Sequence, residues 1–239
     1  MKYIYGPVFS RRLGKSLGLS LTPYKVCSFD CLYCQLGRTT EVTLEKKGYI
    51  PIEEILDELK SWLLYHTQEV PELKYITFSG SGEPTLNINI GKLIQEIKKI
   101  TPVPIAVITN ASLLSDSSVR QAILPADLIV PSLDAVTMSV FQRIDRPHPD
   151  IKIEDVINGL IELRKEFKKE IWLEIMLVSG VNDDIRQIRK FQEVIEKIKP
   201  DKIQLNSPVR TTADADIFPV DKKKLERIKE ELGEKCEIV

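Results

Sequence analysis

Short apolar runs alternate with longer amphipathic stretches along almost all of this 239-residue chain. Short runs rich in β-branched residues predict buried strands, and apolar residues at helical spacing predict helices that cover a sheet. Six strands are expected in this way, at residues 16–21, 74–80, 105–110, 127–134, 171–178 and 202–207. Helices are expected between and after them, at residues 52–65, 88–100, 115–124, 153–167, 183–198 and 221–232. This alternation indicates parallel strands joined by right-handed crossovers, so the sequence predicts an α/β fold.

Two ways of closing such a sheet fit the pattern, an open doubly wound sheet and a barrel or part-barrel. The first strand is not followed by Gly-x-Gly-x-x-Gly, which argues against a dinucleotide-binding fold. Neither an internal repeat nor a low-complexity linker interrupts the chain, so we expect a single domain over residues 1–239.

The composition is ordinary for a water-soluble protein, with 43% hydrophobic and 29% charged residues. We find no apolar run of membrane-spanning length and no signal peptide at Met1, so we expect a cytoplasmic protein without a membrane partner. Thiols stay reduced in the cytoplasm, where clustered cysteines indicate metal binding or catalysis rather than disulfides.

Three of the four cysteines lie within eight residues, in the segment CSFDCLYC, as Cys27, Cys31 and Cys34. A structural zinc site needs four ligands, and the other candidates, His66, His148 and Cys236, are all distant in sequence. Three cysteines on one loop can instead bind three irons of a [4Fe–4S] cluster and leave the fourth iron open to a ligand. A zinc site or a purely structural site is the alternative. Cys236 stands alone and is expected to be a packed thiol.

Polar residues gather at the expected carboxyl ends of the strands, where parallel α/β folds place their ligands. They are Gly80, Gly82, Glu83, Thr109, Asn110, Ser132, Asp134, Gln204 and Asn206. Each has a simpler explanation: Asn110 in a turn, Ser132 and Asp134 capping the next helix, or Glu83 paired with a lysine. Glu174 either faces the inside of the barrel or extends to solvent. Gln204 and Asn206 share one face of their strand and are expected to line a cavity.

The spacing C-x3-C-x2-C, with Tyr33 before the last cysteine, resembles the signature of radical S-adenosylmethionine (radical SAM) enzymes. The resemblance continues in order through GSGEP, TNAS and SLDA at the ends of the next three strands. It implies a partial (β/α)6 TIM-like barrel of parallel strands, the radical SAM core, over about residues 16–207, with a short C-terminal extension over 208–239.

The resemblance also implies a role for each matching residue. The three cysteines would bind three irons, and S-adenosylmethionine would chelate the fourth through its amine and carboxylate. The residues implied in binding this cofactor are Tyr33, Gly80, Ser81, Gly82, Glu83, Asn110, Ser132, Asp134 and Asn206. Ser81 stands where the family usually has glycine. The implied chemistry is one-electron cleavage of S-adenosylmethionine to a 5′-deoxyadenosyl radical, with a donor such as ferredoxin or flavodoxin.

The substrate is less constrained. Residues 1–50 carry eight basic side chains against three acidic ones, a local charge of +5. Among them, Arg11, Arg12, Lys15 and Arg38 either hold an anionic group or pair with nearby acids. The N-terminal segment resembles iron–sulfur oxidoreductases related to wybutosine-type tRNA-modifying enzymes. Arg146 and His148 either serve the cofactor and a proton transfer or hold a loop.

Three functions therefore remain open. The first is an enzyme acting on tRNA or on a small anionic molecule. The second is an activating enzyme that places a glycyl radical on a partner protein. The third is a non-catalytic metal-binding module. The chain has no second cysteine cluster, which argues against enzymes that use an auxiliary cluster.

Overall fold

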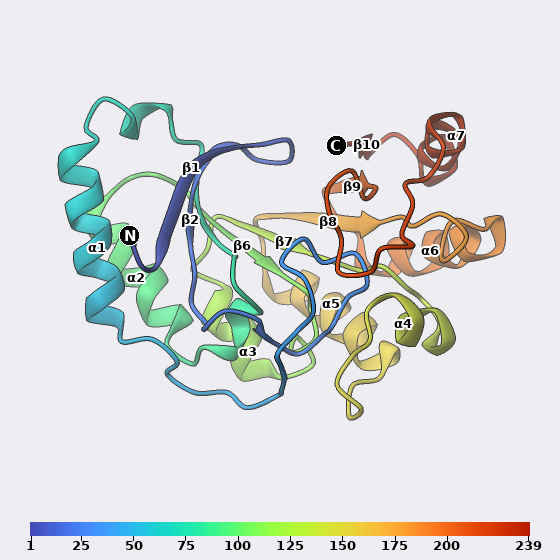
Figure 1. The fold of residues 1–239 in the computed structure, drawn as a ribbon, viewed down its shortest axis with the longest axis horizontal. Coiled ribbons are helices and arrows are strands. Elements are labelled where there is room, and N and C mark those ends of the chain that lie inside the picture. The colour runs from blue at the N-terminus through green and yellow to red at the C-terminus, as the bar shows by residue number, and fades with distance from the viewer.

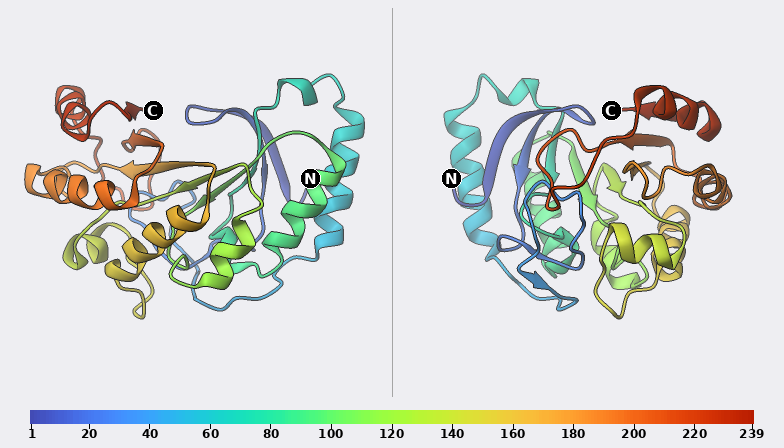
Figure 2. Two further views of the ribbon diagram at one scale, coloured as in Figure 1. Left: turned by 180° about the vertical axis from the view of Figure 1, so that it is seen from behind. Right: turned by 45° about the vertical axis from the view of Figure 1, so that its right-hand side comes forward.

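The computed structural model describes all residues 1–239, and its centre is an eight-stranded sheet in the order β1-β2-β5-β6-β7-β8-β9-β10 (Figure 1). The six inner strands pair in parallel and correspond to the six expected ones. They are β2 (Gly14–Leu19), β5 (Tyr75–Phe78), β6 (Ile105–Thr109), β7 (Leu128–Pro131), β8 (Glu170–Met176) and β9 (Lys202–Asn206). The sheet curls into an open half-barrel, as two further views show (Figure 2), which confirms the predicted partial barrel.

Helices cover the outer face of the curled sheet (Figure 2). They are α1 (Ile52–Tyr65), α2 (Ile90–Ile100), α3 (Ser117–Ile123), α4 (Met138–Ile144), α5 (Ile153–Glu166), α6 (Ile185–Ile198) and α7 (Lys222–Leu232). Each long helix turns one apolar face inward; α1, for example, buries Ile55, Leu59 and Trp62. Burying one such side chain contributes about 1.5–3 kcal/mol, so packing rather than helix propensity holds these helices in place. None of these helices combines the length and the apolar surface that a membrane span requires.

Covering helices on one face and lumen side chains on the other leave the central strands little contact with water. All four residues of β7 are buried, and so are Ile76 and Phe78 of β5. This explains why the central strands appear in the sequence as continuous apolar runs instead of alternating ones.

Two edge strands were not expected from the sequence. β1 (Ile4–Ser10) pairs antiparallel with β2 to form a hairpin, and the register shifts between Tyr5 and Val8. β10 (Cys236–Ile238) pairs in parallel with β9 at the other edge, so the C-terminal extension adds a strand to the sheet. The hairpin tip reaches across the open side of the half-barrel toward β9 and β10 (Figure 1), close to the C-terminus. The buried Cys236 packs in β10, as expected.

Candidate functional site

The three clustered cysteines lie on a loop at the carboxyl end of the barrel strands. The loop begins with β3 (Val26–Cys27), which pairs with β4 (Glu41–Val42), and it is anchored at the end of α4. Backbone bonds from Asp30 N to Asp145 O (3.1 Å) and from Leu32 N to Ile144 O (3.0 Å) make this anchor. As whole residues, all three cysteines are half-buried.

A different polar group contacts each sulfur. Asn110 Nδ2 lies 3.6 Å from Cys27 Sγ, and the ammonium of the buried Lys25 lies 3.1 Å from Cys34 Sγ. Cys31 Sγ donates to Asp145 Oδ1 at 3.6 Å. The amide and ammonium are hydrogen-bond donors of the kind that stabilise metal-bound sulfur.

Burial, together with the smaller effect of the nearby Glu83 carboxylate, raises the pKa of the Cys27 thiol to about 12. Burial also raises the pKa of Cys31 well above its ordinary value. Cysteines bind metals as thiolates, so loading of this site releases protons.

The donor set fits a cluster better than a single metal ion. No three His, Cys, Asp or Glu side chains converge closely enough to hold one ion. A single zinc ion requires its ligands to meet around one point, whereas a [4Fe–4S] cluster binds one cysteine at each of several irons. Three thiols spread over one loop therefore suit the cluster.

The GSGEP loop after β5 packs directly against the cysteine loop. Lys25 N donates to Ser81 O at 2.6 Å, which ties the two loops together. A Cβ added at Gly82 would lie 1.8 Å from the carbonyl oxygen of Val26, so only glycine allows this approach. Gly80 has φ +103°, a conformation that side chains rarely adopt.

Glu83 is buried beneath this loop and accepts four hydrogen bonds. The donors are Thr85 N (3.1 Å), Thr85 Oγ1 (2.6 Å), Thr109 Oγ1 (2.6 Å) and Asn110 N (2.8 Å). Burial raises the pKa of Glu83, and these bonds oppose the rise. The carboxylate connects the ends of β5 and β6, which is a different arrangement from pairing with a surface lysine.

A cavity of about 250 Å³ lies beside Cys34. Five of the nine residues expected to contact the cofactor line it, namely Tyr33, Gly80, Ser132, Asp134 and Asn206. The other four, Ser81, Gly82, Glu83 and Asn110, lie outside its lining and hold the adjoining loops. Residues far apart in sequence are thus brought to one cavity next to a cysteine.

Asp134 is buried and organises one wall of this cavity. Its Oδ1 accepts from Met176 N at 2.7 Å, and its Oδ2 accepts from the Tyr33 hydroxyl. Burial raises the pKa of Asp134, and these two bonds oppose the rise. Neither Ser132 nor Asp134 caps α4, which begins after Thr137 without a side-chain cap.

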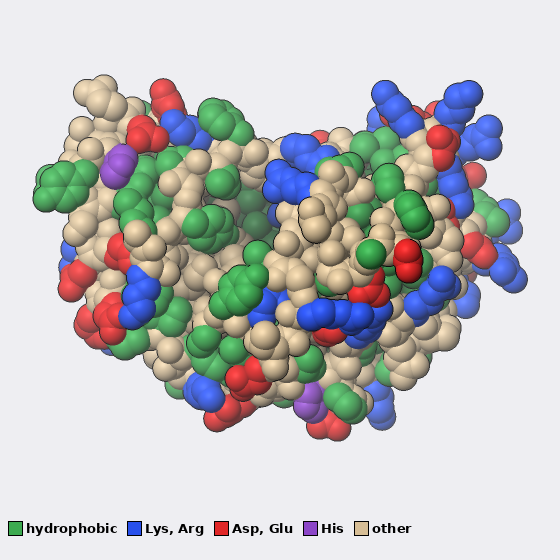
Figure 3. Space-filling model, in the orientation of Figure 1, with side chains coloured by type: hydrophobic (Ala, Val, Ile, Leu, Met, Phe, Trp, Pro, Cys, Tyr) green, Lys and Arg blue, Asp and Glu red, His purple; other side chains and the backbone are tan.

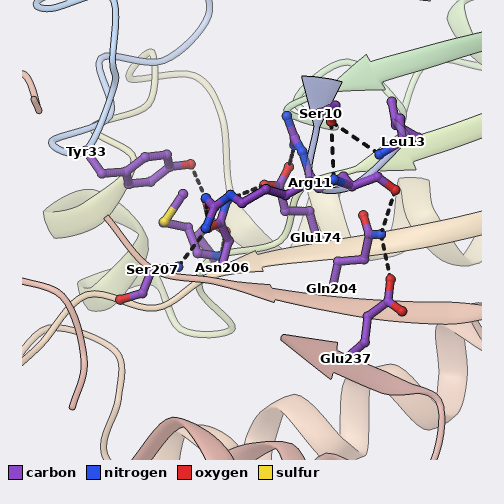
Figure 4. Close-up of polar contacts among 12 residues, drawn as sticks. Ser10, Arg11, Leu13, Tyr33, Glu174, Gln204, Asn206, Ser207 and Glu237 are labelled. Carbon is purple, nitrogen blue, oxygen red and sulfur yellow. Dashed lines mark hydrogen bonds and ion pairs between the residues drawn. The ribbon is translucent and has the colours of Figure 1, made fainter. Parts of the chain in front are cut away.

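Glu174 faces the inside of the barrel, which answers the question that its sequence position left open. Its carboxylate pairs with Arg12 from the hairpin tip and accepts from Asn206 Nδ2 at 3.2 Å. Asn206 Oδ1 in turn accepts from Arg11 at 3.1 Å. Figure 4 shows Arg11, Glu174 and Asn206 pointing toward one another, with Tyr33 on the opposite side of the group. Gln204, deeper on the same face of β9, donates to Glu237 at 2.9 Å.

Several basic residues considered for ligand binding pair with acids instead. Lys15 pairs with Glu69 and Glu72 on the outside of the sheet. Arg38 lies 2.7 Å from Asp214, which also pairs with Arg146. His148, which was also considered for a functional role, lies beside the exposed Asp150, with its Nδ1 3.7 Å from the carboxylate. These four side chains hold loops, and Arg11 and Arg12 remain at the barrel interior.

Sequence reasoning missed three residues of the site. Lys25 and Asp145 contact cysteine sulfurs, and Gln35 lines the cavity beside Cys34. No motif marks them, because their roles depend on where the loop and α4 meet. The positive φ of Lys25, 59°, reflects the turn that brings its ammonium to Cys34.

A second cavity, of about 290 Å³, occupies the inside of the half-barrel below the first. It shares Arg12, Gln35 and Asn206 with the cavity beside Cys34, so the two adjoin. Figure 3 shows this face hollowed near the hairpin tip, with basic side chains at the rim of the hollow. The site thus combines a cysteine loop, a polar cavity next to it and an open lumen.

Proteins from distant organisms resemble this chain over most of its length. A Brachyspira hyodysenteriae protein named GTPase Obg is 42% identical over 237 residues, which are 99% of this chain and 34% of that protein. A UPF0026 protein of Methanocaldococcus jannaschii is 36% identical over 219 residues, 92% of this chain and 67% of the relative. A probable dual-specificity RNA methyltransferase RlmN of Thermotoga maritima is 26% identical over 178 residues, 72% of this chain and 50% of the relative. The chain therefore spans between a third and two thirds of these relatives.

Solved structures share the fold. A radical SAM methyltransferase from Sphaerobacter thermophilus superimposes with a TM-score of 0.70 at 16% identity, covering 94% of this chain and 65% of that one. Archaeal TYW1 superimposes with a TM-score of 0.59 at 21% identity, covering 92% of this chain and 72% of that one.

The family model of the radical SAM superfamily matches residues 21–191. That range contains the cysteine loop, the GSGEP loop and four of the six inner strands, namely β5, β6, β7 and β8. The protein belongs to the radical SAM superfamily.

Proposed function

We propose that Cys27, Cys31 and Cys34 hold a [4Fe–4S] cluster and that the adjoining cavity holds S-adenosylmethionine. The observation that carries the proposal is that five separately predicted cofactor contacts line one cavity next to Cys34. They come from the cysteine loop and from the ends of β5, β7 and β9, as expected of a ligand site on parallel strands. Enzymatic function follows from superfamily membership.

When bound, the cluster and S-adenosylmethionine supply a 5′-deoxyadenosyl radical, which abstracts hydrogen from a substrate. The residues of the chain position and enclose these groups. Lys25 places a positive charge next to Cys34, and Asp134 fixes the Tyr33 ring through its hydroxyl. Glu83 holds the ends of β5 and β6 together beneath the site. The hairpin tip covers the open side of the barrel, which limits the access of water.

We further propose a cytoplasmic enzyme that receives its electron from ferredoxin or flavodoxin. For the substrate we favour an anionic molecule or an RNA, because Arg11 and Arg12 extend into the barrel interior. Relatives named as RNA methyltransferases agree with this choice. A glycyl-radical activase would instead form a stable complex with a large partner protein.

Anaerobic reconstitution followed by dithionite and S-adenosylmethionine tests the proposal. The wild-type protein should bind iron and sulfide and release 5′-deoxyadenosine, which a non-catalytic metal module cannot do. Cys31→Ala should lose the cluster and the product together. Cys236→Ala is the matched control, since it removes a buried cysteine far from the loop and should keep both. A Cys31→Ala variant with an intact cluster and full product release would refute the ligand assignment.

A further inference from the structure

The cavity inside the half-barrel has an unbalanced charge. Its volume is about 290 Å³, and its lining includes three arginines, Arg11, Arg12 and Arg210, but neither aspartate nor glutamate. A concave surface of one charge sign concentrates ligands of the opposite sign. The cavity therefore favours an anion.

The three arginines differ in what neutralises them. Arg12 pairs with the buried carboxylate of Glu174. Arg11 donates only to the amide oxygen of Asn206, at 3.1 Å, and Arg210 only to that of Gln35, at 3.3 Å. A guanidinium has five N–H donors, so most donors of Arg11 and Arg210 remain free for a ligand.

The two amides also fix where a bound anion would lie. Asn206 and Gln35 line both the inner cavity and the cavity beside Cys34. An anion held by Arg11 and Arg210 would therefore lie next to the proposed cofactor. Apolar side chains, among them Tyr5 and Phe9, also line this cavity.

From this arrangement, and resting on the function proposed above, we infer that the substrate carries a phosphate group bound by Arg11 and Arg210. Two guanidinium groups on separate segments match a group with several charged oxygens, because each can form its own paired hydrogen bonds. The rest of the substrate then lies against Tyr5 and Phe9. The phosphate belongs either to a free phosphorylated molecule or to an RNA strand.

Calorimetric titration of the reconstituted protein, saturated with S-adenosylmethionine, tests this inference. The probes are uridine 5′-monophosphate, uridine, and hexauridylate without a terminal phosphate; adenine compounds are avoided because they compete for the cofactor cavity. Uridine 5′-monophosphate should bind more tightly than uridine. Arg11→Gln and Arg210→Gln should each weaken its binding about tenfold. Arg11→Lys should weaken it less, and Arg227→Gln, which changes an exposed arginine on α7, should not affect it.

Each result of the titration would either support or overturn the inferred phosphate site. Hexauridylate binding that falls in both glutamine variants, without binding of the mononucleotide, would support the inference and identify RNA as the source of the phosphate. Absence of binding by both phosphate probes would overturn it, and so would binding that is equal in the wild type and both glutamine variants. Wild-type protein that releases 5′-deoxyadenosine but binds neither phosphate probe would overturn this inference and leave the proposed function standing.

Discussion

Single residues at the site show how closely its two loops depend on one another. Gly82 allows the GSGEP loop to approach Val26, immediately before the first cysteine. Lys25 continues the connection through its backbone to Ser81 and through its ammonium to Cys34. Small changes in the GSGEP loop should therefore alter the binding of the proposed cluster.

Gly82→Ala tests this dependence. The added Cβ would meet backbone, which cannot move aside as a side chain can, so the cysteine loop must shift. We expect a loss of about 1–3 kcal/mol in the free energy of unfolding and a lower iron content after reconstitution. Gly48→Ala is the control, because its Cβ would meet only the side chain of Asn89. Equal iron content and stability in the two variants would contradict the close packing of the loops.

At the scale of elements, the hairpin tip is joined to the far side of the half-barrel. Arg12 reaches across the opening to Glu174 on β8, and its backbone carbonyl accepts from Gln204 on β9 at 3.4 Å. The side chain of Glu174 is 8% exposed, so removal of Arg12 would leave a buried carboxylate without its cation. Removing one member of a buried ion pair lowers the free energy of unfolding more than replacing both members does.

Arg12→Met should therefore lower the free energy of unfolding by about 3 kcal/mol. The double variant with Glu174→Gln should recover part of this loss, because a neutral amide no longer requires a cation. Arg186→Met provides a control, since Arg186 pairs with Asp184 at the surface and should change stability little. Denaturant titration measures all four proteins. An Arg12→Met variant as stable as the wild type would show that the hairpin tip does not depend on this pair.

A helix cap gives a pH-dependent prediction at the same scale. Asp116 caps α3 by accepting from Ser118 N at 2.8 Å, and it pairs with Lys46. Bonds from Lys46 and Ser118 lower the pKa of Asp116 from 3.8 to about 2. Because the folded-state pKa is the lower one, this stabilisation is complete above pH 4 and is lost as the pH falls toward 2.

Asp116→Asn should flatten this part of the stability–pH curve while keeping a capping side chain. The effect at neutral pH should be below about 1 kcal/mol, because the two side chains are 33% and 39% exposed and solvent screens the pair. Thermal unfolding between pH 2 and 5 measures it. Identical curves for the two proteins in this range would contradict the assigned pKa shift.

The inner strands were predictable from the sequence because burial on both faces produces continuous apolar runs. The covering helices were predictable because burial on one face produces apolar residues at helical spacing. α1 was expected at 52–65 and lies at Ile52–Tyr65, and β9 differs from its expected range by one residue. β1 was missed because most of its side chains are exposed or half-buried and Pro7 interrupts it, so no apolar alternation marks it. β10 has only three residues, too few for a pattern.

The site was predictable where a motif carries the chemistry and unpredictable where the contact depends on three-dimensional packing. Tyr33, Asp134 and Asn206 were expected at the cofactor site and line one cavity. Glu83 was expected to contact the cofactor, but its carboxylate is enclosed by Thr85, Thr109 and Asn110. The sequence could not show these bonds, because they join loops that follow different strands.

For the molecule as a whole, two adjoining cavities lie between the cysteine loop and the open side of the half-barrel. This arrangement agrees with the proposed binding sites, with the cofactor beside the cysteines and the substrate in the barrel interior. Both cavities meet at Arg12, Gln35 and Asn206. A substrate in the lower cavity would thus be close to the cofactor while the barrel wall and hairpin tip keep it from bulk solvent.

The central claim is that three cysteines leave one iron of the cluster free to bind S-adenosylmethionine. Electron paramagnetic resonance of the reconstituted, dithionite-reduced protein, recorded without and with S-adenosylmethionine, tests it most directly. The account predicts that the spectrum of the reduced cluster changes on addition of the cofactor and that 5′-deoxyadenosine accumulates afterwards. A fully loaded cluster whose spectrum stays the same, with no product formed, would contradict it.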